Sequence, residues 1–568
     1  MTGGAGGGRP DPPGNRRAAA LVGGGILLSR LAGLARERAL SNYLGVGPAV
    51  DAFRAAVRIP NVLQNLLGEG VLSASFIPVY SRSLAEGDEE EAGRIAGAVA
   101  GLLAALAGTL VVIGVVFARP LTKVLAPGFT GERFELTVTL TRILTPGIGL
   151  LVLSAWCLGV LNSHRRFFLS YVAPVLWNVA QIVVLVALGL RGVEGGGLAK
   201  GLAWGAFVGG ALQLGVQLPV VASLVRPLRL SLRTDLPGVR DVLRRFGPVV
   251  AGRGVVQLSA YVDLLLASLL AVGAVSALGY AQVFYLLPVS LFGMSVAAAE
   301  LPELSRAAAA PELPGSGGTA VAVLADRLDR GLARIAFFVV GTSVAYLVLG
   351  DLVVGALLQT GEFRADDARL VWYTLGAFTL GLLATTASRL VQNALYALGD
   401  TKGPAAIAGL RVGVAAAVGG ILMFQLDRVG LVGPGLDGLL LLERLPAPVA
   451  PLPVAERTDG ALRLGAVGLA AASGMAAWLE LALLRRRLAR AGASIHLGGG
   501  TLGRLLVAAT VAAGLGALLR PVATDLPPVL GLVVAGVPAG IAYVFVCQVL
   551  AVSEATSLLG EVRRRLRR

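Results

Sequence analysis

Residues 29–80 read SRLAGLARERALSNYLGVGPAVDAFRAAVRIPNVLQNLLGEGVLSASFIPVY, a stretch that mixes apolar runs with many charges. A charge at the centre of a lone membrane helix costs about 2.5–3.5 kcal/mol on insertion scales. Several charges in one apolar stretch therefore predict a water-filled cavity, internal ion pairs or a charged ligand. The ionisable side chains of this stretch are Arg30, Arg36, Glu37, Arg38, Asp51, Arg54, Arg58 and Glu69.

The composition of the whole chain predicts the scaffold around that cavity. The chain has 568 residues, of which 55% are apolar, and its mean hydropathy is +0.77. Apolar runs of about 20 residues, the length that crosses a hydrocarbon core, recur along the sequence. We predict an all-α polytopic membrane protein with about fourteen transmembrane helices. The 77 glycines suit close contact between helices in lipid.

The net charge of +15 is explained by membrane orientation better than by nucleic-acid binding. Lysine and arginine gather in alternate connections, such as residues 226–245 and 485–504, and in the C-terminal tail. The intervening connections, such as residues 191–198 and 523–527, hold few basic residues. Because cytoplasmic loops carry the basic excess, this asymmetry predicts an even number of spans with both termini cytoplasmic.

Four landmarks recur at nearly one offset and suggest an internal duplication. The matched pairs are Pro60 with Pro288, Pro78 with Pro302, Gly47 with Gly273, and Pro174 with Pro404. A duplicated unit of six helices predicts two lobes related by a pseudo-two-fold axis along the membrane normal. Chance agreement stays open as an alternative, since proline and glycine are common in this chain.

The predicted organisation has five parts. They are a disordered cytoplasmic tail (1–17), an N-lobe of helices 1–6 (18–225), a basic cytoplasmic linker (226–246), a C-lobe of helices 7–12 (247–486), and helices 13–14 with a basic tail (487–568). The C-lobe includes a proline-rich outside loop, residues 426–458, which we expect to be irregular.

The motifs SRLAGLARE, GVGPAVDAF and RIPNVLQNLLGEGVLSASFIPV closely resemble the opening of the MurJ (MviN) family of lipid II flippases. LNSHRRFFLSYVAPVLWNV, GPVVAGRGVVQLSAYVDLLLAS, LLQTGEF and NALYALGDTKGP extend the resemblance over nearly the whole chain. It implies a fourteen-helix flippase of the bacterial inner membrane, within the multidrug/oligosaccharidyl-lipid/polysaccharide exporter superfamily. Such a protein moves the undecaprenyl-pyrophosphate-linked peptidoglycan precursor, lipid II, to the outer leaflet by alternating access. The last two helices would form a groove for the lipid tail, and membrane lipids and the cell-wall synthesis machinery are implied partners.

The resemblance implies a set of substrate-binding residues in the first two helices. Arg30 and Arg36 match two cavity arginines, and Arg58 falls where many members carry a basic residue. Guanidinium suits a pyrophosphate, since it stays charged and offers a planar fork of donors. Asp51 and Glu69 match acidic positions of the family. The alternatives are ordinary interface charges around Arg36, a snorkelling side chain at Arg58, and an ion pair that holds helix packing at Glu69.

Two departures from the family pattern remove expected positive charges. Gln64 and Val283 stand where members commonly carry basic residues. Arg253 lies in an apolar run of the predicted seventh helix, and we expect it to supply the lost positive potential to the same cavity. The alternatives are that it pairs with a neighbouring acid or lies near the cytoplasmic end.

A cation site is the second candidate. Some family members bind sodium between the seventh and eleventh helices, and the matching positions are Asp263, Tyr396 and Asp400, with Val412 and Ala416 nearby. An intramembrane carboxylate such as Asp263 is a functional candidate in itself. Either Na⁺ or H⁺ could couple there, and no cofactor is expected. Asp400 could instead cap the following helix.

Other functions fit the sequence less well. A multidrug exporter would favour an aromatic, acidic cavity over the arginine-rich helices seen here, although a flippase for another polyprenyl-linked glycan stays open. His164 and His496 are expected in cytoplasmic loops, and no nucleophile or paired-acid motif supports an enzyme. No GxxxxGK loop is present, so ATP hydrolysis is not expected. A transport-inactive scaffold is the remaining alternative.

Overall fold

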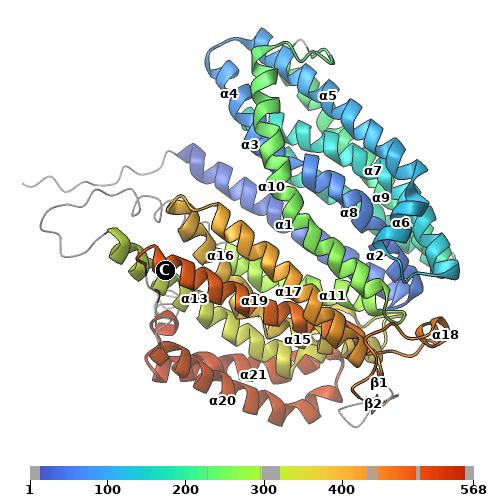
Figure 1. Cartoon of the computed structure of the whole chain (residues 1–568), viewed down its shortest axis with the longest axis vertical. Helices are drawn as coiled ribbons and strands as arrows, with labels where there is room; N and C mark the ends of the chain where they lie inside the picture. The colour runs from blue at the N-terminus through green and yellow to red at the C-terminus, as the bar shows by residue number, and fades with distance from the viewer. Residues whose placement is uncertain are drawn as a thin grey trace, which may run out of the picture. The chain divides into compact units, whose positions relative to one another are not determined.

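The computed structural model describes residues 13–226, 228–294, 296, 320–431, 439–441, 445–493, 495 and 499–556. Within these ranges, the side chains of 13–23, 59, 62, 251–260, 294, 320–323 and 499 are outside the description. The described chain is almost entirely helical, as Figure 1 shows. This confirms the predicted fold class.

The chain divides into two compact units. The first, unit 1, comprises Met1–Leu44, Ala55–Leu125 and Gly131–Leu258. Its helices are α1 (Pro13–Leu44), most of α2 (Pro48–Leu67), α3 (Glu69–Ser75), α4 (Ile77–Ala85), α5 (Glu89–Val116), α6 (Ala118–Leu125), α7 (Gly131–Ser163), α8 (Phe167–Gly189), α9 (Gly195–Leu224) and the first part of α10 (Pro237–Ser268). Thus α1 already includes residues 13–17, which the sequence placed in the N-terminal tail.

The second, unit 2, comprises Gly45–Arg54, Ala126–Thr130 and Ser259–Arg568. After the end of α10 it holds α11 (Ala274–Pro288), the π-helix η1 (Val289–Met294), α13 (Ala320–Val348), α14 (Gly350–Leu358), α15 (Ala365–Thr379), α16 (Leu382–Ala397) and α17 (Lys402–Leu426). There follow β1 (Val429–Leu431), β2 (Leu439–Leu441), α18 (Val454–Arg457), α19 (Gly465–Arg490), α20 (Gly499–Thr524) and α21 (Pro528–Val549).

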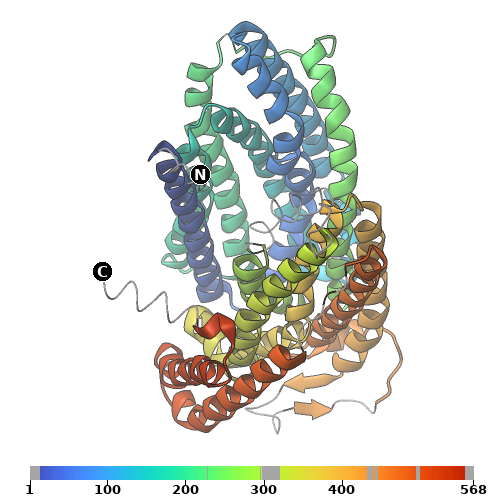
Figure 2. The same cartoon turned by 90° about the vertical axis from the view of Figure 1, so that its left-hand side faces the viewer.

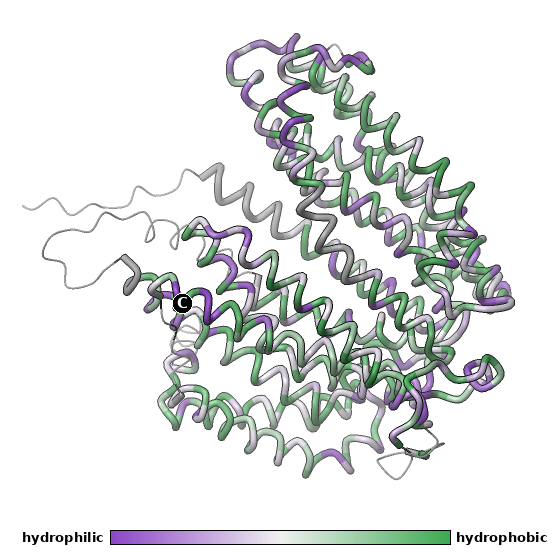
Figure 3. The backbone as a smooth tube through the Cα atoms, viewed as in Figure 1, coloured by the Kyte–Doolittle hydropathy of each residue, from purple (hydrophilic) through white to green (hydrophobic). Residues whose placement is uncertain are grey.

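The helices of the described residues are long and apolar enough for a multi-pass membrane protein. Eleven could cross a membrane, or up to 12 if α15 and α16, which meet at a bend of 44°, form one span. Two more helices, α1 and α10, have 32 residues each but carry several charges. The described residues therefore support 11 or 12 candidate spans, and the prediction of fourteen stays a prediction. Figure 3 shows the apolar colour along the helices, with hydrophilic residues gathered toward their ends.

Glycine sets the close packing of helices in unit 1. A Cβ added at Gly209 of α9 would lie 2.8 Å from the Cα of Trp177 in α8. A Cβ added at Gly147 of α7 would lie 2.8 Å from the Cα of Phe207 in α9. Because dispersion contacts replace the hydrophobic effect inside lipid, this close approach is what holds such helices together.

The second predicted span is broken into three helices rather than one. Pro60 lies inside α2, and α2 ends one residue before Gly68, which begins the break to α3. A Cβ at Gly68 would lie 2.1 Å from the carbonyl oxygen of Gln64, so the chain turns there only because a side chain is absent. Phe76 separates α3 from α4. Pro60 therefore does not end α2, and the discontinuities of this charged span lie at Gly68 and Phe76.

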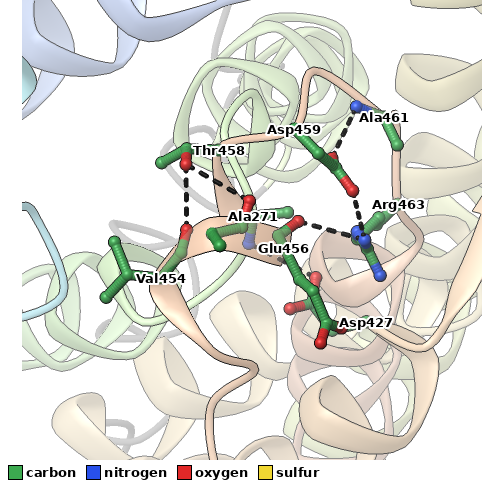
Figure 4. A network of polar contacts seen from close by, with 9 residues as sticks. Ala271, Asp427, Val454, Glu456, Thr458, Asp459, Ala461 and Arg463 are labelled. Carbon is green, nitrogen blue, oxygen red and sulfur yellow. Dashed lines mark hydrogen bonds and ion pairs between the residues drawn. The ribbon is translucent and has the colours of Figure 1, made fainter.

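Two short strands lie within the segment 426–458, which the sequence predicts to be an outside loop. Strands β1 and β2 pair antiparallel, with Val429 opposite Leu441, and Figure 2 draws them as two arrows. Figure 4 shows the polar network that follows them, in which Arg463 donates to the carbonyl oxygen of Glu456 (3.0 Å) and to the carboxylate of Asp459 (2.7 Å). The described part of this segment thus holds two three-residue strands and the short helix α18, and the rest of it is irregular.

Candidate functional site

Helix α1 presents arginines with different surroundings. Arg30 and Arg38 are exposed within the described structure, while Arg36 is half-buried. The guanidinium of Arg36 lies 2.7 Å from the carboxylate of buried Glu37 and 5.1 Å from the ring centre of Trp177 in α8. Arg36 is therefore fixed by a carboxylate on one side and an aromatic ring on the other, an arrangement that orients its remaining donors.

Helix α2 carries the other predicted basic residue. Arg58 is half-buried and Glu69, the first residue of α3, is exposed. Arg54, one turn before Arg58, stacks its guanidinium 4.3 Å from the ring centre of Tyr280 in α11. A Cβ at Gly279 would lie 2.5 Å from the Arg54 side chain, so this glycine makes room for the stacked arginine.

Asp51 is fully buried at the start of α2 and binds the N-terminus of α11. Its carboxylate accepts hydrogen bonds from the backbone N–H groups of Gly273 and Ser276 and from the hydroxyl of Ser276, each at 2.8 Å. Free N–H groups and the helix dipole make this a favourable place for a negative charge. These contacts account for the carboxylate without a ligand.

The positions that depart from the family pattern are both half-buried. Gln64 lies in α2 and Val283 in α11. The backbone of Arg253 lies in α10, but its side chain is outside the described residues, so its predicted role stays a prediction.

The three predicted cation-site residues have different surroundings. Asp263 is half-buried in α10, and Tyr396 is 44% exposed in α16. Asp400 accepts hydrogen bonds from the backbone N–H of Gly403 (3.0 Å) and from the guanidinium of Arg487 (3.1 Å to Nη2). Asp400 therefore caps α17, the alternative considered from the sequence, and its carboxylate is neutralised by a guanidinium rather than left open to a metal ion.

Sequence reasoning also missed a buried acid. Glu480 of α19 is 3% exposed, and its two oxygens accept hydrogen bonds at 2.9 Å from Gln392 of α16 and from Arg411 of α17. The signal was available, since Glu480 interrupts the apolar run AAWLELALL inside a predicted span. Gln392 and Arg411 are polar residues in spans as well, but only the structure brings the three together.

Unit 2 contains an apolar cavity of about 380 Å³ between α13, α20 and α21. Its walls include Phe337 and Phe338 of α13, Gly516 of α20, and Gly536 and Tyr543 of α21. The glycines leave the wall open, and the aromatic rings supply apolar surface. This cavity is built by the last two helices, where the resemblance implies a groove for a lipid tail.

Many membrane-length helices, several of which carry charged side chains within them, are typical of a polytopic membrane transporter. A solved structure described as lipid II flippase MurJ in an inward closed conformation shares the fold, with a TM-score of 0.71 at 20% identity over 93% of this chain and 98% of that one. An inward-facing multidrug resistance MATE family transporter of the MOP superfamily matches with a TM-score of 0.57 at 18% identity, over 83% of this chain and 98% of that one.

Sequence comparisons then show the particular family. The family model for lipid II flippase MurJ matches residues 40–433. A lipid II flippase MurJ from Burkholderia cenocepacia is 33% identical over 394 residues, which cover 67% of this chain and 73% of the relative. A probable lipid II flippase MurJ from Rhizobium tropici is 32% identical over 400 residues, covering 70% and 73%. This chain belongs to the MurJ family of lipid II flippases, and it is a transporter rather than an enzyme.

Proposed function

We propose that this protein flips lipid II, an undecaprenyl-pyrophosphate-linked peptidoglycan precursor, across the bacterial cytoplasmic membrane for cell-wall synthesis. The observation that carries the proposal is the family match over residues 40–433, which includes α2 and its arginines. Both termini lie in the cytoplasm on the basis of loop charge. The two predicted six-helix lobes alternate access, and components of the cell-wall synthesis machinery are candidate partners.

The pyrophosphate is bound by arginine in this proposal. Arg30, Arg36 and Arg58 supply the positive charge, with Arg253 as a fourth source. The contact of Arg36 with Glu37 and Trp177 supports a fixed orientation for its donors. Glu69 is exposed at the start of α3, and we expect it to face the polar head group. Asp51 contributes indirectly, by holding the start of α11.

The lipid tail and the coupling ion involve unit 2. The apolar cavity between α13, α20 and α21 suits part of a polyprenyl chain, because aliphatic and aromatic side chains bury isoprenoid surface. Asp263 is a candidate for Na⁺ or H⁺ uptake because it is a carboxylate within a long helix of the membrane domain. Tyr396 would contribute its hydroxyl. Energy would then come from an ion gradient or the membrane potential.

Complementation tests the proposal. A bacterium depleted of its own lipid II flippase receives the wild-type chain, the Arg30→Ala variant or a matched Arg94→Ala variant. Arg94 is an exposed arginine of α5 that pairs with Glu90. We expect growth with the wild type and with Arg94→Ala, and lysis with well-expressed Arg30→Ala. Absence of rescue by a well-expressed wild type would contradict lipid II flipping by this chain.

A further inference from the structure

Glu480, Gln392 and Arg411 form a buried polar cluster inside unit 2. Helices α16 and α17 both pack on α19, and the cluster joins all three. Burying a lone carboxylate in a membrane protein is costly, so such residues mark functional positions when they are paired inside the protein. Glu480 is 3% exposed at its side chain, whereas Arg411 is 25% exposed. The cluster therefore has a buried acidic side and a more open basic side.

The donors of Arg411 are only partly used. One nitrogen, Nη1, donates to Glu480 at 2.9 Å, and within the described chain the other guanidinium nitrogens make no hydrogen bond. Because a guanidinium has five N–H groups in a rigid fork, fixing one edge orients the other toward whatever approaches it. Glu480 is thus a positioning residue for the open edge of Arg411.

A second arginine lies beside the cluster without an acidic partner. Arg389, in the middle of α16, is exposed, and no carboxylate among the described residues pairs with it. Arg389 lies three residues before Gln392 in α16, so the two side chains are neighbours on one face of that helix. Gln392 and Arg411 both donate to Glu480. Arg389 therefore lies one helical turn from the cluster that holds Arg411, and the charge of the two arginines with Glu480 is net positive.

We propose that Arg389 and Arg411 of unit 2 form a diphosphate-binding site, with Glu480 and Gln392 positioning Arg411. A net positive patch inside a membrane-spanning unit needs an anionic ligand, and two guanidinium groups match the several oxygens of a diphosphate. These arginines come from α16 and α17, so they are separate from the basic residues implied by family resemblance. The proposal rests on the proposed lipid-diphosphate substrate. It also offers a source of positive charge for a chain with valine at position 283.

Binding of geranyl pyrophosphate, a short polyprenyl diphosphate, to the purified full-length protein in detergent tests this site. We expect Arg389→Gln and Arg411→Gln each to weaken binding by about tenfold, the effect of losing one charge-assisted hydrogen bond. Geranyl monophosphate should lose less affinity in the same variants, because it offers fewer oxygens. Arg330→Gln is the matched control, an exposed arginine of the same unit that pairs with Asp326, and its affinity should equal that of the wild type.

The role of Glu480 needs a readout that separates positioning from packing. Glu480→Gln should lower both the thermal stability and the affinity for geranyl pyrophosphate, because Arg411 loses its acidic partner. In the double variant Glu480→Gln/Arg411→Gln the stability should recover, since no lone charge remains buried, while the affinity should stay low. Recovery of both properties would overturn the proposed site, and so would unchanged affinity in Arg389→Gln and Arg411→Gln.

Complementation separates this inference from the proposed function. Rescue by the wild type together with loss of rescue by Arg389→Gln and Arg411→Gln supports both. Rescue by the wild type and by both variants retains lipid II flipping and overturns the second site. Failure of the wild type contradicts the flippase proposal, and the affinities for geranyl pyrophosphate then decide on the arginine site independently.

Discussion

Asp51 and Asp400 are both acidic residues placed at the start of a helix in unit 2, yet their surroundings are opposite. Asp51 is fully buried and accepts three hydrogen bonds from residues of α11, more than 220 residues further along the chain. Asp400 is partly exposed and caps α17, which begins two residues later. The carboxylate of Asp51 binds α11, a distant segment, whereas that of Asp400 caps the adjacent helix α17 and also binds Arg487 of α19.

The two residues show which structural roles of an acidic residue can be predicted from sequence and which cannot. Both residues were candidates for ligand binding because they match acidic positions of the family that the sequence resembles. The local cap at Asp400 was also foreseen, because GDTKGP has the form of a helix start. The cap made by Asp51 could not be foreseen, since nothing in VGPAVDAF points to α11.

Among substitutions of acidic residues, those at Asp51 should lower the folding stability most. In Asp51→Ala two backbone N–H groups and a hydroxyl lose their acceptor in a buried place. We expect a loss of about 3–5 kcal/mol in the free energy of unfolding, measured by thermal unfolding of the purified protein in detergent. Asp51→Asn, which keeps one acceptor oxygen, should lose less. Equal stability of Asp51→Ala and the wild type would show that the cap is dispensable.

Asp427 is a useful third case, because it is as buried as Asp51 but accepts fewer hydrogen bonds. Its Oδ1 accepts one long hydrogen bond (3.4 Å) from the N–H of Ala271, and its Oδ2 has no hydrogen-bond partner among the described residues. Burial raises the pKa of Asp427 to about 6, although Arg463, Arg428 and Arg457 lower it in part. Burial alone therefore disfavours a carboxylate, and bonded donors are what distinguish Asp51.

The raised pKa of Asp427 predicts the direction of a pH effect. The folded state holds the proton more tightly than the unfolded chain, so this group's stabilisation is complete below about pH 4 and is lost as pH rises through about 6. The contribution of Asp427 to the free energy of unfolding changes by about 2–3 kcal/mol over this pH range. Asp427→Asn should remove it, so the variant should gain stability over the wild type between pH 4 and pH 7 in thermal unfolding. A constant difference across that range would contradict the assignment.

Substitution of Asp400 should change the folding stability least of the three acidic residues. Its contribution should also depend on pH in the opposite direction from that of Asp427. The guanidinium of Arg487 and, to a lesser extent, the N–H of Gly403 lower the pKa of its carboxyl group. Its contribution is therefore present above the unfolded pKa of about 4 and is lost as pH falls through the lower folded value. Exposed pairs contribute little. The unfolding temperatures of wild type and Asp400→Asn should differ slightly at pH 7 and converge near pH 3; a difference that grows in acid would refute this.

The sequence was sufficient for the fold class and most helices, because a membrane span is encoded in one continuous apolar run. It was less informative where a span is discontinuous. Pro60 was visible, but the breaks at Gly68 and Phe76 depend on how neighbouring turns pack. The pairing of β1 with β2 was missed because each strand has three residues.

Some residues of the candidate site could likewise be predicted from the sequence, and others could not. Arginines in α1 and α2 stand out in the sequence, since they interrupt apolar runs. Glu480 interrupts one as well, but its meaning depends on Gln392 and Arg411, which lie 88 and 69 residues away. Spacing along one helix cannot reveal a cluster that three helices build together.

The size of the cavity between α13, α20 and α21 has a consequence for substrate range. About 380 Å³ is near the lower end of pockets that hold drug-sized molecules, far less than a whole undecaprenyl chain occupies. Under the proposed function, this cavity would enclose only a short segment of the tail at one time, and the remainder would stay among the acyl chains of the membrane. Isoprene units beyond that segment should then have little effect on whether a lipid is accepted, so substrates with shortened tails should remain usable in reconstituted assays.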